Sequence, residues 1–152
     1  MATWTAALYL KELRDNLQLR PGLDGVQIHG APIGSNDRIN EAIAFIDIDT
    51  VENSAALGDR RREEEYVIEG VIEVNQAGSG DDIADVARER AIEILAEIEA
   101  EVRAKPDAGL NTPGVEQIVR MSEITRKNLR QRTREDYRVA IIEVDVTVRT
   151  RI

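Results

Sequence analysis

Residues 81–103 read DDIADVARERAIEILAEIEAEVR, a pattern that predicts one long amphipathic helix. Apolar residues return every three or four positions and form a single stripe, while acids and arginines fill the opposite face. The stripe comprises Ile83, Val86, Ala87, Ala91, Ile94, Leu95, Ile98 and Val102. Ser79 and Asp82 have the spacing of a capping box, and Lys105 and Pro106 are typical of a helix end. Because so wide a stripe must be buried, the helix needs a flat apolar partner, and the remaining sequence predicts a β-sheet.

The segments on either side of this helix predict the other elements. An earlier helix is expected at residues 3–18, where apolar residues also keep helical spacing. Short apolar or alternating runs predict strands at 25–30, 41–50, 63–75, 115–125 and 136–152. Because the strands cluster on both sides of the long helix, we predict a single α+β domain over residues 1–152. Its core should be a mostly antiparallel mixed sheet of about five strands, with two helices packed on one face and a long C-terminal β-hairpin.

The alternation within each strand predicts which side chains face the helices. In the strand at 41–50, one face should carry Ala42, Ala44, Ile46 and Ile48. The other face of that strand should carry Ile43, Phe45, Asp47 and Asp49. The face of the sheet away from the helices should be charged along Glu69, Glu73, Glu143 and Asp145. We expect such a face to meet water or another subunit.

Composition limits the class of function. The 152-residue chain has a formal net charge of -9, so its surface as a whole should repel DNA and anionic membranes. Aromatic residues make up only 3%, too few for a stacking platform for single-stranded nucleic acid. The lack of cysteine excludes disulfides, thiol catalysis and cysteine-bound zinc. No apolar run reaches the roughly 20 residues of a membrane span and no signal peptide is evident, so we expect a protein made in a cytoplasm, with no membrane partner.

The length of the final strand exceeds the diameter of a compact domain of this size. About fifteen extended residues span roughly 50 Å, whereas a compact chain of this length has a diameter of about 40 Å. The hairpin that this strand forms should therefore overhang the domain or bend at a bulge. An overhanging hairpin leaves unpaired strand edges, which a neighbouring chain usually covers, so we expect a homo-oligomer.

Two pairs of acids raise the question of a divalent-cation site. Asp47 and Asp49 share one face of their strand, and Glu143 and Asp145 do so on the last strand. If these strands were neighbours, the four carboxylates would converge on Mg²⁺ or Ca²⁺, as in a small metal-dependent enzyme. The alternative, which we favour, is an ordinary solvated sheet face. His29, the only histidine, lies next to a glycine and is more typical of a surface turn than of a catalytic base.

Two charged segments are the candidate contact surfaces. Residues 126–134, RKNLRQRTR, are a basic island in an acidic protein, and residues 59–65 read DRRREEE. The island is interpreted as a mobile loop that meets an acidic protein surface, with phosphate contacts or a solvated hairpin tip as alternatives. The block at 59–65 is typical of a solvated loop and also suits contacts between identical subunits. The candidate interface residues are Arg60, Arg61, Arg62, Glu63, Glu64, Glu65, Arg126, Lys127, Arg130, Arg132 and Arg134.

The order and character of these elements resemble a known family. An N-terminal helix leads into GVQI at residues 25–28, and the charged strand EEEYVIEGVIEV at 63–74 is followed directly by the long helix. The strand YRVAIIEVDVTVRTRI at 137–152 closes the chain. Over residues 3–150 this pattern resembles the tail terminator (minor tail, tail-completion) proteins of long-tailed, lambda-type bacteriophages.

The resemblance implies a structural virion protein that is not an enzyme and has no cofactor or catalytic residues. It implies a hexameric ring that caps the tail tube, ends tail polymerisation and joins the tail to the head. The implied partners are further copies of the chain, the tail tube protein and the head-tail connector or stopper protein. DNA would only pass through the lumen, where an acidic wall lets it slide without specific contacts. The resemblance also implies assembly in the host cytoplasm and a place in the tail or neck, with another neck or connector protein of the same virion as the alternative.

Overall fold

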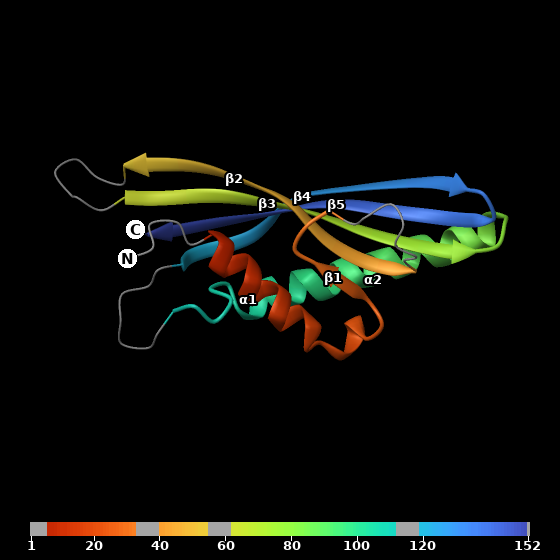
Figure 1. Ribbon diagram of the computed structural model, residues 1–152, viewed down its shortest axis with the longest axis horizontal. Helices are drawn as coiled ribbons and strands as arrows, with labels where there is room; N and C mark the ends of the chain where they lie inside the picture. Colours follow the sequence, from red (N-terminus) through yellow and green to blue (C-terminus); the bar gives the residue numbers. More distant parts are fainter. Residues whose placement is uncertain (1–5, 33–39, 55–61, 112–118, 152) are drawn as a thin grey trace.

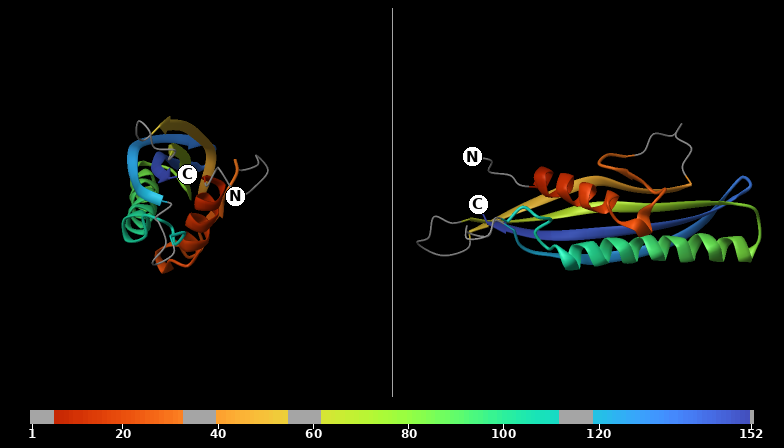
Figure 2. Two further views of the ribbon diagram at one scale, coloured as in Figure 1. Left: turned by 90° about the vertical axis from the view of Figure 1, so that its left-hand side faces the viewer. Right: turned by 90° about the horizontal axis from the view of Figure 1, so that it is seen from below.

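The computed structural model describes residues 6–32, 40–54, 62–111 and 119–151, which form two α-helices and five strands (Figure 1). In chain order the elements are α1 (Ala6–Gln18), a 3₁₀ turn η1 (Pro21–Leu23), β1 (Gln27–His29), β2 (Glu41–Ser54), β3 (Arg62–Ala77), α2 (Asp81–Ala104), β4 (Val119–Arg134) and β5 (Tyr137–Arg151). One sheet contains the strands in the order β1-β2-β3-β5-β4. The β1–β2 pair is parallel and the other pairs are antiparallel. Both helices lie on one side of the sheet (Figure 2), which confirms the predicted α+β fold and its C-terminal hairpin, β4–β5.

Helix α2 is the long helix that the sequence predicts, extended by one residue to Ala104. Its 24 residues span about 36 Å and pack against β3, β5 and β4. Val86, which belongs to the predicted stripe, is 47% exposed, so the buried stripe is narrower than the apolar one. The buried apolar residues of the helix are Ala87, Ala91, Ile94, Ile98 and Val102.

The predicted capping box at Ser79 and Asp82 is wrong. The N-cap residue is Gly80, and no side chain caps the first turn. Gly78 and Gly80 have φ angles of 121° and 96°, which turn the chain sharply from β3 into α2 and which residues with a Cβ rarely adopt. The carboxylates of Asp81 and Asp82 lie in the first turn, where they complement the positive end of the helix dipole.

The hydrophobic core lies between the helices and the inner face of the sheet, which we define as the face toward the helices. Alternate residues of β3 and β5 are buried there: Tyr66, Ile68, Ile72, Val74, Ala140, Ile142, Val144, Val146 and Val148. Helix α1 buries Tyr9, Leu13 and Leu17. The Tyr9 ring meets the Tyr66 ring edge-on, with centroids 6.1 Å apart, and so joins α1 to the sheet.

A β-bulge in β2 overturns the predicted facing of this strand. The register shifts between Phe45, which lies opposite Gly70, and Asp47, which lies opposite Glu69. The extra residue, Ile46, changes the face of every later residue. The inner face therefore carries Ile43, Phe45 and Ile48, and the outer face carries Ala42, Ala44, Asp47 and Asp49. The bulge keeps the large apolar residues Ile43, Phe45 and Ile48 on the inner face and the acids Asp47 and Asp49 on the outer face.

The basic island is not a loop, contrary to the sequence prediction. Strand β4 continues to Arg134, and residues 126–134 pair with residues 137–145 of β5. Likewise, the strands predicted at 41–50 and 63–75 are longer than expected toward each other, because β2 runs to Ser54 and β3 begins at Arg62. The strand predicted at 115–125 begins outside the described residues, which resume at Val119.

The sheet extends beyond the helices that cover it, at the end where β2 finishes and β3 begins (Figures 1 and 2). Strand β4 also shifts register against β5 near Met121 and near Thr125, so the long hairpin bends at bulges as well. Among the described residues, two strand edges have no neighbouring strand. One is the outer edge of β4, and the other is the edge of β2 beyond Ala44, because β1 pairs only with residues 42–44.

Candidate interaction surface

The outer face of the sheet, away from both helices, gathers charged side chains from four strands. The register places Asp47, Glu69, Asp145 and Arg126 side by side in one row across β2, β3, β5 and β4. Directly opposed positions in an antiparallel pair have Cβ atoms about 5 Å apart, so neighbouring carboxylates repel unless a countercharge is close. The row therefore combines three acids with one arginine on the edge strand.

The edge strand carries a basic column, which we define as Arg126, Arg130, Arg132 and Arg134. These residues lie on the outer face because they occupy alternate positions of β4. The Arg126 Nη2 atom lies 3.2 Å from Glu143 Oε2, and Arg130 donates to the same carboxylate. Arg132 and Arg134 each lie 3.9 Å from Glu73 Oε1, two strands away. The predicted acidic surface opposite the island is thus present within the chain itself.

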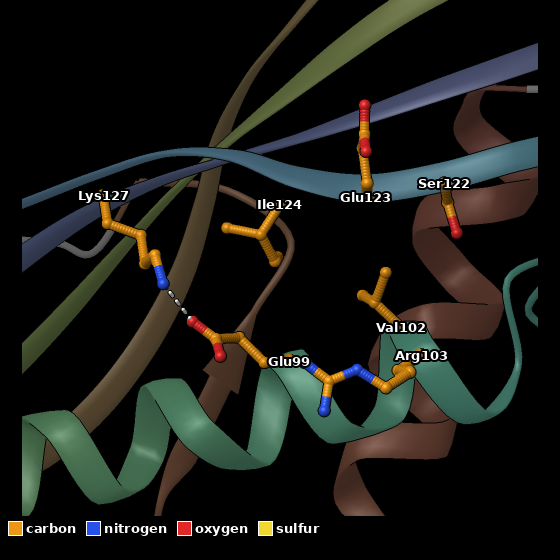
Figure 3. A pocket seen from close by; sticks show the side chains of 7 residues that line it. All are labelled: Glu99, Val102, Arg103, Ser122, Glu123, Ile124 and Lys127. Atoms are coloured by element: carbon orange, nitrogen blue, oxygen red, sulfur yellow. Dashed lines mark hydrogen bonds and ion pairs between the residues drawn. The ribbon is translucent and has the colours of Figure 1, made fainter.

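Lys127 belongs to the opposite face of β4 and points toward α2. Its Nζ atom lies 2.8 Å from Glu99 Oε1 (Figure 3). The pair ties the edge strand to the helix, and it crosses a shallow pocket of about 290 Å³ between them. The pocket is lined by Glu99, Val102, Arg103, Ser122, Glu123, Ile124 and Lys127. Within it, the Ser122 hydroxyl donates a hydrogen bond to the Pro106 carbonyl oxygen at 2.6 Å.

The outer-face acids of β2 and of β3 at Glu69 differ in their ion pairing from the acids near β4. Asp47, Asp49 and Glu69 have no ion-pair partner in the part of the chain that the structure describes, and we call these three residues the acidic zone. Asp47 Oδ1 accepts a hydrogen bond from the adjacent Ile48 amide, at 2.9 Å. The outer face is therefore divided, with uncompensated negative charge toward β2 and basic charge on β4.

The block at 59–65 is split by the fold. Arg60 and Arg61 lie outside the described residues, and Arg62 and Glu63 begin β3. Glu64 is buried at 1% exposure, on the inner side of the strand. Glu65 is on the outer face and accepts from Arg149 at 2.9 Å. The two candidate segments are not brought together, because Glu65 lies opposite Arg149 whereas residues 126–134 pair with the other end of β5.

The four-carboxylate cation site does not form. Strand β3 separates the Asp47–Asp49 pair on β2 from the Glu143–Asp145 pair on β5. The described residues contain no group of three or more histidine, cysteine or acidic residues arranged to hold a metal ion. His29 lies 3.1 Å from the side-chain oxygen of Gln27, its neighbour on β1. None of the helices in the described ranges is long and apolar enough to cross a membrane.

Sequence reasoning located the charged segments but missed how they pair. The alternate spacing of Arg130, Arg132 and Arg134 has the period of a strand and was the available signal that the island is not a loop. No local signal could reveal that Glu73 faces two of these arginines, because the contact crosses β5.

The comparisons with known proteins agree with this fold. No protein-family model matches the chain, and no curated protein matches it. A chain in a solved structure described as the virion of a native gene transfer agent (GTA) particle has a similar fold, with a TM-score of 0.53. The match covers 97% of this chain and 99% of that chain at 16% sequence identity. At this identity the likeness shows a shared fold over the full length of both chains.

Proposed function

We propose that this protein is a structural component of a phage-like virion, a tail terminator that forms a hexameric ring on the end of the tail tube. The ring stops polymerisation of the tail tube and joins the tail to the head-tail connector or stopper protein. The protein assembles in the host cytoplasm, resides in the tail or neck of the virion, and acts without catalysis or cofactor.

The observation that carries the proposal is the fold shared with a chain of the gene transfer agent virion, which extends over nearly the whole of both chains. The order of elements, which resembles the tail terminator family, supports the same role. A sheet with two open edges supports self-assembly, because a neighbouring chain usually covers long unpaired edges.

The charge of the protein is compatible with a ring around DNA. The chain has a net charge of -9. A lumen of the same sign as DNA allows passage without tight contacts.

The test is the mass of the purified chain across a concentration series, measured by light scattering and analytical ultracentrifugation. We expect a species with the mass of six chains and ring-shaped particles in electron micrographs. We also expect that the ring, added to the polymerising tail tube protein of the same virion, arrests tube growth. A chain that remains monomeric up to on the order of 1 mM and does not bind the ends of tubes would contradict the proposal.

A different neck or connector protein of the same virion is the second candidate. The description of the solved structure names the whole particle and no position within it, so the shared fold supports this role as well. Co-purification separates the two roles. A tail terminator binds the tail tube protein and limits tube length, whereas a neck protein binds the head connector and leaves tube length unchanged.

A further inference from the structure

We propose that copies of this protein join by continuing the sheet, with the open edge of β4 in one copy pairing with the open edge of β2 in the next. The inference rests on the proposed self-assembly and deepens it by naming the two surfaces in contact and their polarity. The partner is a second copy of this chain in the same orientation.

Strand direction supports this arrangement. The four long strands are antiparallel in the order β2-β3-β5-β4, so their directions alternate and β2 runs opposite to β4. When two copies stand side by side in the same orientation, β4 of the first therefore meets β2 of the second in antiparallel sense. The alternation of strand direction therefore continues across the contact, and the peptide groups of both edges gain hydrogen-bond partners. Because the two edges differ, the contact is heterologous, which is the type that generates closed rings.

The described residues leave both edges accessible over long stretches. On β2, the parallel strand β1 covers only residues 42–44, so the edge is open beyond the bulge, where Ile46 is 37% exposed. On β4, the outer edge has no neighbouring strand, and Leu129 is 39% exposed. The short β1 thus limits the pairing to the second half of β2.

The charges of the two edges are complementary. On the β4 side, Glu143 and Glu73 are each shared by two arginines of the basic column, so these four cations have fewer nearby carboxylates than they can bind. On the β2 side, Asp47, Asp49 and Glu69 of the acidic zone have no ion-pair partner among the described residues. Continuing the charged row of the sheet into the next copy places Arg126 of the first copy beside Asp47 of the second.

The same charges disfavour the wrong contacts. Two β4 edges would oppose their basic columns, and two β2 edges would oppose their acidic zones, so both symmetric pairings are repulsive. Only the pairing of unlike edges is attractive. The pattern therefore selects a head-to-tail arrangement and excludes an edge-to-edge dimer with a two-fold axis.

The experiment is a charge exchange in the full-length chain. One variant carries D47K and D49K on β2, where neither acid has an ion pair with another of the described residues. The second carries R126E and R132E on β4, a choice that leaves Glu143 with Arg130 and Glu73 with Arg134. The control carries D15K and E89K, which change the charge by the same amount as D47K and D49K but on exposed positions of α1 and α2. Thermal unfolding of each variant establishes that it is folded.

We expect each edge variant alone to lose the oligomer at concentrations where the wild type and the control form it. Mixing the two edge variants should restore it, because every β4–β2 contact in an alternating ring then joins unlike charges. The mixed ring should contain the two variants in equal numbers, which mass spectrometry of the intact assembly can count. Combining all four substitutions in one chain should also restore assembly.

The outcomes separate this inference from the function on which it rests. If the wild type forms rings and the edge variants form them equally well, the edge pairing is wrong while the proposed function stands. If the edge variants fail and the mixture does not recover, β4 and β2 do not contact each other and the inference is also wrong. A wild-type chain that never associates overturns the ring and the edge pairing together.

Discussion

The Nη1 atom of Arg20 lies 2.7 Å from Oε2 of Glu101, a carboxylate on α2 whose residue is only 5% exposed. The Nε atom of the same guanidinium lies 2.6 Å from Glu97 Oε2, one helical turn away. The hydrogen bond to Glu97, and to a smaller extent the one to Glu101, raises the pKa of Arg20 above its ordinary value, so the guanidinium stays charged. We call Arg20, Glu97 and Glu101 together the clamp. Arg20 follows α1 directly, and the clamp therefore fastens the end of α1 to α2.

Replacing Arg20 with alanine should destabilise the protein by about 2–4 kcal/mol, because it leaves the buried Glu101 carboxylate without its countercharge. Urea unfolding at neutral pH measures the change. The matched control is R103A, an exposed arginine at the end of the same helix, which should change the stability by about 0.5 kcal/mol or less. Equal effects of the two substitutions would contradict the role assigned to the clamp.

Tyr9 should make the protein sensitive to alkaline pH. Burial raises the pKa of its hydroxyl from 10.0 to about 12. Because the folded pKa is higher than the unfolded one, the stabilisation is complete below about pH 10 and is lost as the pH rises toward 12. Two pKa units correspond to about 3 kcal/mol. Unfolding by urea between pH 9 and pH 12 should show this loss in the wild type and not in Y9F, and parallel pH profiles would exclude it.

Gly70 should not accept a side chain without cost. It lies on the inner face of β3 between Phe45 and Val144, and a Cβ there would be 3.2 Å from an atom of each. Substitution with alanine should cost about 1–3 kcal/mol, because both neighbours must move in a packed core. Thermal unfolding measures the cost. G70A should cost less in a protein that already carries F45L than in the wild type, because leucine is smaller than phenylalanine. Equal costs in the two proteins would place the strain elsewhere.

The ion pairs of the basic column should contribute little to stability. Arg126 and Arg130, which share Glu143, have side chains that are 51% and 65% exposed. Neutralising the carboxylate with E143Q should cost less than about 1 kcal/mol, and the difference should disappear at high salt. Urea unfolding at low and high ionic strength provides the measurement. A loss above about 2 kcal/mol that persists in salt would mean that these pairs are structural and not merely solvated.

Much of the fold follows from local patterns along the chain. The apolar stripe of α2 and the alternation of β3 and β5 were predictable, because helix and strand periods depend on neighbouring residues only. The α+β class, the helices on one face and the C-terminal hairpin follow from the order of those elements. The acidic outer face at Glu69, Glu73, Glu143 and Asp145 was predictable for the same reason.

The remaining features arise from contacts between residues distant in the chain. The bulge at Ile46 exists because β2 must match β3, and no local pattern within β2 marks it. Residues 126–134 form a strand because they pair with residues 137–145 of β5, and the acids that meet their arginines, Glu143 and Glu73, come from other strands. The strand order alone places β3 between the two acid pairs and leaves β2 and β4 as opposite open edges. Periodicity is a property of short segments, whereas register, strand order and ion pairing belong to the assembled sheet.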